Sequence, residues 1–139
     1  DAASAATIRT RESLRDTEQK IAELSLLSKH ITTYRKLKPT YDRYKASSDK
    51  EKFLRGFESE IILFEAAARA IKASGIGKLP SSEKLQAEID ELTARKTVLQ
   101  AEYQKAQKEE REYDTLRQNV DMLLAVPQEQ QRQPSHDLE

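Results

Sequence analysis

The feature that most constrains the fold is a regular ladder of residues over positions 82–126. Its members recur at alternating steps of four and three residues, and they are Leu85, Ile89, Leu92, Lys96, Leu99, Tyr103, Ala106, Glu110, Tyr113, Arg117, Val120 and Leu124. This alternation keeps one face of an α-helix turned toward a partner helix. No Gly or Pro interrupts the stretch. We therefore predict one long helix over residues 81–126 that packs against other helices as in a coiled coil.

Two shorter helices are predicted before the long one. The first covers residues 7–37, and Pro39 ends or kinks it because proline has no backbone N–H and disfavours helix at the preceding residue. The second covers residues 49–74, where Ser48 and Glu51 have the spacing of a capping box. Gly75 and Gly77 follow it and are expected to stop it.

The two ends of the chain differ in composition from the helical part. Residues 1–6 are small and Ala-rich, which predicts a frayed linker. Residues 127–139 are polar, Gln-rich and begin with Pro127, which predicts a disordered tail. The last two residues resemble a cloning remnant, so we expect a piece of a longer protein with one helical module over residues 7–126.

The predicted fold is all-α: an elongated antiparallel helical bundle or coiled coil of three main helices, with a kinked basic connector around Pro39. Two arrangements remain. An up-down-up bundle would leave the end of the third helix protruding. Alternatively, the third helix runs antiparallel to the second helix with its first half and to the first helix with its second half. We favour the latter because it leaves less of the ladder in water. The same ladder also permits self-association through the long helix, so the oligomeric state stays open.

Overall composition excludes several classes of function. The 24 basic and 24 acidic residues give a net charge of zero, so global charge favours no partner. There is no Cys, which excludes disulfides and thiolate metal sites. No apolar run approaches the roughly 20 residues of a membrane span, and no signal peptide is visible. We therefore expect no membrane partner.

Local charge is less even, because residues 29–55 contain nine basic and three acidic side chains, a net charge of +6. Phosphate groups are neutralised by clustered Lys and Arg, and single-stranded bases stack on Tyr. The candidate nucleic-acid contacts are Lys29, Tyr34, Arg35, Lys36, Lys38, Tyr41, Arg43, Tyr44 and Lys45. The alternative, which is the more common outcome for a run of charges, is a solvated connector whose tyrosines plug the end of the bundle.

No pattern in the chain is typical of an enzyme. His30 and His136 are far apart, and neither belongs to a metal-binding motif. Residues 75–78 read Gly-Ile-Gly-Lys, which has too few glycines and the wrong spacing for a phosphate-binding loop. We expect no catalytic residue, metal, cofactor or small-molecule substrate.

One family resemblance goes further than these patterns. Residues 79–92 read Leu-Pro-Ser-Ser-Glu-Lys-Leu-Gln-Ala-Glu-Ile-Asp-Glu-Leu, and further matching positions are Tyr44, Phe53, Ile61, Ala67, Tyr103, Asn119 and Val120. Over about residues 8–125 the chain resembles the C-terminal helical region of relaxases, the mobilisation nucleases of conjugative and mobilisable bacterial elements. In such proteins an N-terminal domain nicks one strand at the transfer origin with a tyrosine nucleophile and a histidine-held metal. No motif here matches that domain, so none of its residues is carried over.

The resemblance implies a cytoplasmic, non-catalytic module of a DNA-mobilisation relaxase. Such a module would help to hold DNA, either single-stranded or transfer-origin duplex, or would dock onto other conjugation proteins. The alternative is a structural or protein-interaction coiled coil with no nucleic-acid role. That alternative predicts self-association or partner binding through seam positions such as Tyr113 and Val120.

Overall fold

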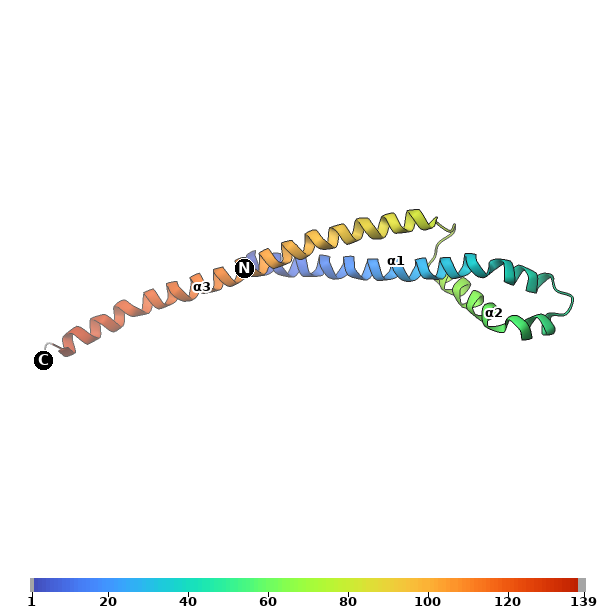
Figure 1. The fold of residues 1–139 in the computed structure, drawn as a ribbon. Helices are drawn as coiled ribbons and strands as arrows, with labels where there is room; N and C mark the ends of the chain where they lie inside the picture. The colour runs from blue at the N-terminus through green and yellow to red at the C-terminus, as the bar shows by residue number, and fades with distance from the viewer. Residues whose placement is uncertain (1, 138–139) are drawn as a thin grey trace. The chain divides into compact units, whose positions relative to one another are not determined.

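The computed structural model describes the backbone of residues 2–137 and the side chains of residues 2 and 4–125. Within this part the chain forms three helices and no strand: α1 (Ala2–Ala46), α2 (Lys50–Ala73) and α3 (Ser82–Asp137) (Figure 1). The predicted all-α class with three packed helices is confirmed. Over the described residues, none of the helices combines the length and the apolar character of a membrane span.

Contacts divide the chain into two units, which we describe separately. The hairpin unit is Thr17–Arg95 and contains the later part of α1, all of α2 and the start of α3. The terminal unit is Asp1–Asp16 with Lys96–Glu139, so it joins the start of α1 to the later part of α3.

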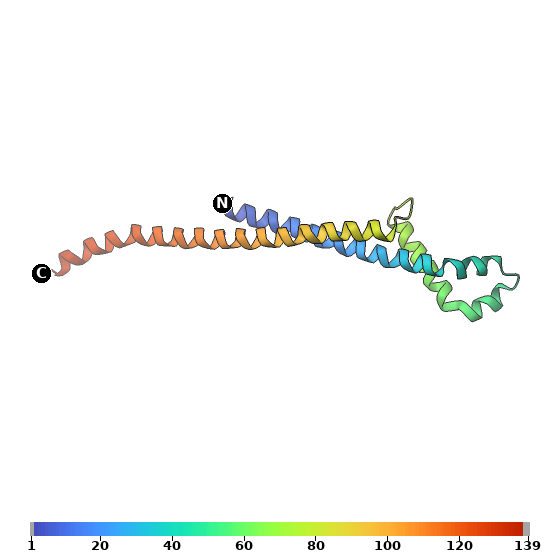
Figure 2. The ribbon, with the colours of Figure 1, turned by 45° about the horizontal axis from the view of Figure 1, so that its top comes forward.

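The three helices of the hairpin unit meet at a buried cluster that takes one residue from each helix. Ile31 of α1, Ile71 of α2 and Leu85 of α3 form one buried cluster, and partly buried neighbours surround it, namely Leu24, Leu27, Tyr34 and Leu79. α2 turns back along the C-terminal part of α1 as an antiparallel hairpin (Figures 1 and 2). The three helices are thus held by apolar contacts between residues far apart in the sequence.

The structure corrects the arrangement that we favoured. α3 starts beside α1, where the Arg35 Nη2 donates a 2.6 Å hydrogen bond to the Pro80 carbonyl and where Leu85 packs near Ile31. It then runs antiparallel to α1 within the hairpin unit, instead of along α2 with its first half (Figure 2). The reason is that α2 ends beside Ile31, so the following turn brings the chain back onto α1.

α1 does not end near residue 37 as predicted. It begins at Ala2, in the segment expected to be a frayed linker, and it continues through Pro39 to Ala46. The residues expected to form a connector are therefore the last turns of a helix. Tertiary contact overrides the proline signal, because Tyr34 before Pro39 and Tyr41 after it both stack on Phe64 of α2.

Capping side chains and a glycine determine where α2 begins and ends and where α3 begins. The predicted capping role of Ser48 belongs instead to Asp49, whose carboxylate accepts a 3.1 Å hydrogen bond from the Lys52 N–H. Gly75 follows the last turn with φ of 80°, a left-handed conformation that favours glycine, so its predicted stop is confirmed. Ser81 precedes α3, and its hydroxyl accepts from the Lys84 N–H at 3.1 Å.

α2 contains a break that we did not predict. Phe57 has non-helical backbone angles (φ −133°, ψ 26°) directly after Gly56. Glycine is a common position for a helix kink. The Phe53 ring stacks on the Phe57 ring at this break, with 4.7 Å between the ring centroids.

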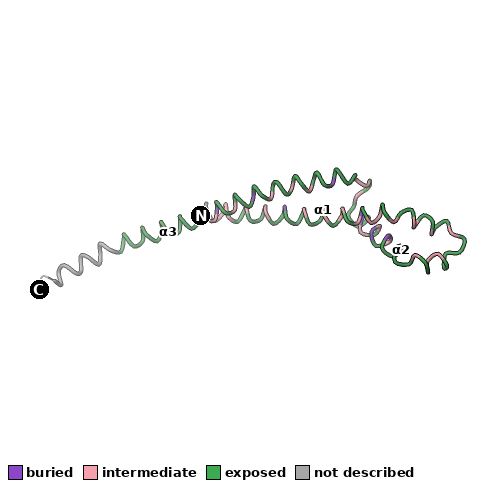
Figure 3. The backbone as a smooth tube through the Cα atoms, viewed as in Figure 1, coloured by how far each residue is buried: buried purple, intermediate pink, exposed green. Residues whose placement is uncertain are grey.

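The ladder of α3 is confirmed as a packing face up to Glu110. In the hairpin unit Leu85 is buried and Ile89 and Leu92 are partly buried. In the terminal unit Leu99 and Ala106 are buried, and the Ser4 hydroxyl of α1 donates a 3.1 Å hydrogen bond to the Glu110 carboxylate. All residues at positions 111–125 are exposed (Figure 3).

α3 also runs past the predicted end at residue 126. The helical backbone continues through Pro127 to Asp137. A proline inside a helix removes one backbone hydrogen bond and does not by itself require the chain to leave the helix. The side chains after Ala125 lie outside the described residues, so the disorder expected for 127–139 stays a prediction.

Candidate nucleic-acid interface

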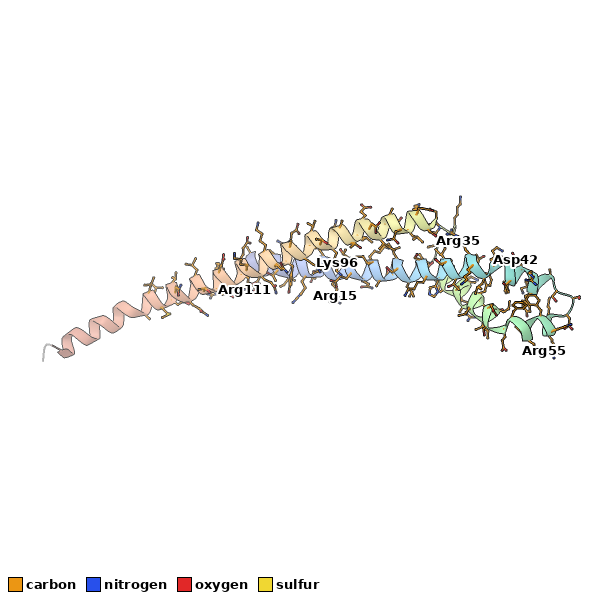
Figure 4. The ribbon with its side chains drawn as sticks, viewed as in Figure 1. Arg15, Arg35, Asp42, Arg55, Lys96 and Arg111 are labelled. Atoms are coloured by element: carbon orange, nitrogen blue, oxygen red, sulfur yellow. The ribbon has the colours of Figure 1, made fainter. Side chains whose placement is uncertain are left out.

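All nine candidate contacts lie in the hairpin unit, on the C-terminal half of α1. Figure 4 labels one of them, Arg35, on this helix. The six basic side chains are exposed: Lys29, Arg35, Lys36, Lys38, Arg43 and Lys45. The three tyrosines are only partly exposed. The structure therefore separates the candidates into an outward basic set, which we call the basic surface, and an inward aromatic set.

The aromatic set packs within the fold. Phe64 lies between Tyr34 and Tyr41, with centroid distances of 4.8 Å and 4.3 Å. Tyr44 lies 6.0 Å from Tyr41 and 6.0 Å from Phe53. Stacked rings of this kind contribute about 0.5–1.5 kcal/mol per pair beyond their buried area. These contacts favour the alternative in which the tyrosines close the end of the bundle.

Phe64 is the residue that sequence reasoning missed at this site. It is a buried member of the apolar face of α2. A signal was present, because Tyr34 and Tyr41 are seven residues apart and therefore lie on one face of a helix.

Four of the six basic side chains also contact other residues of the hairpin unit. The Arg43 guanidinium lies 5.6 Å from the Phe53 ring centroid and 5.7 Å from that of Phe57. The Lys45 ammonium lies 5.4 Å from the Tyr41 centroid. Arg35 donates to the Pro80 carbonyl, and Lys38 pairs with Asp42 at 3.2 Å. These exposed cation–π contacts are weak, on the order of 0.5–1 kcal/mol, and leave the charges facing water.

Lys29 and Lys36 differ from the other four. Within the described part of the chain neither makes a hydrogen bond, an ion pair or a ring contact. They are seven residues apart, so they share a face of α1, and they lie on the side away from the buried Ile31.

Two of the three acidic side chains within residues 29–55 have polar partners. Asp42 pairs with Lys38, and Asp49 accepts the capping hydrogen bond at the start of α2. Because two of the three carboxylates have partners of their own, they offer little local compensation for Lys29 and Lys36.

The histidines and carboxylates of the described residues form no metal site. No group of three or more His, Cys, Asp or Glu side chains gathers among these residues in a way that could hold a metal ion. His30 lines a hollow of about 590 Å³ between α1 and α2, together with apolar side chains that include Leu24, Leu27 and Ile76. His136 lies outside the described side chains.

Comparisons with known proteins gave no match, either to a family model, to a curated protein or to a solved structure. The resemblance to relaxases therefore stays a prediction from the sequence.

Proposed function

We propose that this chain is a non-catalytic helical module of a DNA-mobilisation relaxase, and that its basic surface holds the DNA backbone. The observation that carries the proposal is the exposure of all six basic side chains, only one of which pairs with a carboxylate among the described residues. The resemblance to relaxases supports DNA as the polyanion. The aromatic contacts remove base stacking from the proposal, so the expected binding is sequence-independent.

Three residues of the basic surface form a row along α1 whose spacing suits a phosphate backbone. Lys29, Lys36 and Arg43 follow one another at intervals of seven residues, which is about 10.5 Å along a helix at ~1.5 Å per residue. Successive charges on one DNA strand are about 3.4 Å apart along the axis, so one interval spans roughly three nucleotides. A row of basic side chains at this spacing can thus contact several phosphates of one strand without reading any base.

The proposal is tested by titrating the protein with single-stranded and duplex oligonucleotides at several salt concentrations. With about three phosphate contacts, log K should fall with log salt with a slope near −3 for duplex and near −2 for single strands. Changing Lys29→Ala and Lys36→Ala together should weaken binding and make the duplex slope shallower by about 2. Neither side chain makes a contact that stabilises the fold, so the helix content of the double variant should not change.

A matched control removes the same charge elsewhere. Lys105 and Arg111 are exposed on α3, and Lys105→Ala with Arg111→Ala lowers the net charge equally. This control should bind DNA as the parent protein does. No binding at about 50 mM salt, where several phosphate contacts give strong affinity, would overturn the proposal. An equal loss in both double variants would also count against it, because overall charge alone would then explain binding.

A further inference from the structure

A second surface, on α3 in the terminal unit, is unrelated to the basic surface. Beyond Glu110 six large apolar side chains are exposed, including Met122 and Leu124. The other four recur at a regular spacing: Tyr113 at 46%, Leu116 at 61%, Val120 at 45% and Leu123 at 68%. We call these four residues the apolar stripe. Contiguous exposed apolar surface on a charged helix is costly in water and commonly marks an interaction site.

The spacing of the apolar stripe is that of a coiled-coil seam. It keeps Tyr113 and Val120 of the ladder but takes the apolar Leu116 and Leu123 in place of Arg117 and Leu124. Its members follow one another at steps of three, four and three residues, which corresponds to positions a, d, a and d of two heptads. The d positions are both Leu, and the second a position is the β-branched Val120. In a parallel coiled coil, a β-branched residue at a with Leu at d favours two strands over three or four.

The charges beside the seam favour a parallel partner. In this frame Glu112 occupies position g and Arg117 the following position e. A parallel second copy brings each Glu112 beside the other copy's Arg117, which forms two opposite-charge pairs. An antiparallel copy places g positions beside g positions and e positions beside e positions, so Glu112 and Arg117 no longer meet. Glu112 now lies 4.0 Å from Lys108 in a highly exposed pair, which is worth little and is easily exchanged.

We propose that the apolar stripe is covered by the same stripe of a second copy of this chain, in a parallel two-stranded coiled coil over residues 113–123. The seam is short, because Glu109 occupies the preceding d position and Pro127 the following a position. Four layers give a weak dimer, which forms at high protein concentration and dissociates on dilution. This self-association does not depend on DNA binding.

The first experiment measures molar mass by analytical ultracentrifugation over a wide range of protein concentrations. The parent protein should shift from monomer to dimer. Leu116→Glu with Val120→Glu puts carboxylates into two seam layers and should weaken association by about 100-fold or more. Met122→Glu is the control for an added carboxylate off the seam, since Met122 is exposed at 65%, and this variant should dimerise as the parent does. Circular dichroism checks that all variants keep their helicity.

The second experiment determines the orientation. The chain has no Cys, so a Leu116→Cys variant carries a single thiol. In the parallel pair the two 116 positions face each other, and mild oxidation should yield a covalent dimer. An antiparallel pair places position 116 opposite 120, so only a mixture of Leu116→Cys and Val120→Cys chains would cross-link efficiently.

The third experiment tests the charge pairs. Arg117→Glu and Glu112→Arg should each weaken the homodimer, because each replaces two attractive pairs by two repulsive ones. Mixing the two variants restores both pairs and should restore association.

Three results would overturn the proposal. The first is a strict monomer at every concentration, including the case in which another protein binds the stripe instead. The second is a dimer unaffected by Leu116→Glu with Val120→Glu. The third is cross-linking confined to the mixed Leu116→Cys and Val120→Cys sample.

Discussion

The ring of Tyr41 in α1 stacks on the ring of Phe64 in α2, with 4.3 Å between the centroids. Tyr34 stacks on Phe64 at 4.8 Å, so one ring of α2 is held between two rings of α1. Pro39 lies between the two tyrosines in sequence. The helix is therefore supported on both sides of the residue that should interrupt it.

Removing the central ring should destabilise the hairpin unit. Phe64 is 5% exposed, and Phe64→Ala should lower the free energy of unfolding by about 3–5 kcal/mol. Urea denaturation measures this loss, and hydrogen exchange should show earlier opening of residues 40–46. Phe64→Leu keeps most of the volume and should cost less. A loss below about 1 kcal/mol for Phe64→Ala would show that the stacking contributes little.

Replacing the proline should have the opposite effect. Pro39 is exposed inside α1, so Pro39→Ala removes no packing and restores one backbone hydrogen bond. An interior proline costs about 3 kcal/mol, and the freer unfolded chain of the variant offsets up to about 1 kcal/mol of this. We expect a net gain of about 2 kcal/mol in thermal or urea unfolding. A destabilised variant would mean that the helix does not continue through this position.

The start of α2 offers a matched pair of substitutions. Asp49→Ala removes the side chain that accepts from the Lys52 N–H and should cost about 1 kcal/mol. Ser48→Ala changes an exposed neighbour that the capping geometry does not use, and its effect should stay within about 0.5 kcal/mol. Equilibrium unfolding of both variants distinguishes the two caps. The reverse order of effects would return the capping role to Ser48.

The turn after α2 offers a second pair. Gly75 has φ of 80°, so Gly75→Ala places a side chain in the left-handed region and should cost about 1–2 kcal/mol. Gly77 lacks a positive φ, and a Cβ added there would meet open space. Gly77→Ala should therefore be neutral or slightly stabilising, by up to about 1 kcal/mol. Thermal unfolding compares the two, and equal effects would argue against the left-handed turn at Gly75.

Much of the candidate site could be predicted from the sequence, because charge is a property of single residues. The six basic side chains were expected at a surface, and they are exposed. The groups that the tyrosine rings pack against could not be predicted in the same way. Whether Tyr34 faces a base or another ring depends on Phe64, which is 30 residues away and approaches only after α2 has folded back.

The sequence by itself determined the all-α class, the packing ladder up to Glu110 and the stop at Gly75, because these depend on periodicity and on backbone preferences within one or two turns. Only the tertiary structure decided that α1 continues through Pro39 and that α3 packs beside α1 rather than along α2. Contacts between distant residues decide such choices, since a few kcal/mol of packing at Phe64 or Ile31 outweighs one local signal. The same reason applies to α3 beyond Glu110, where the apolar repeat continues in the sequence but no described part of the chain covers it.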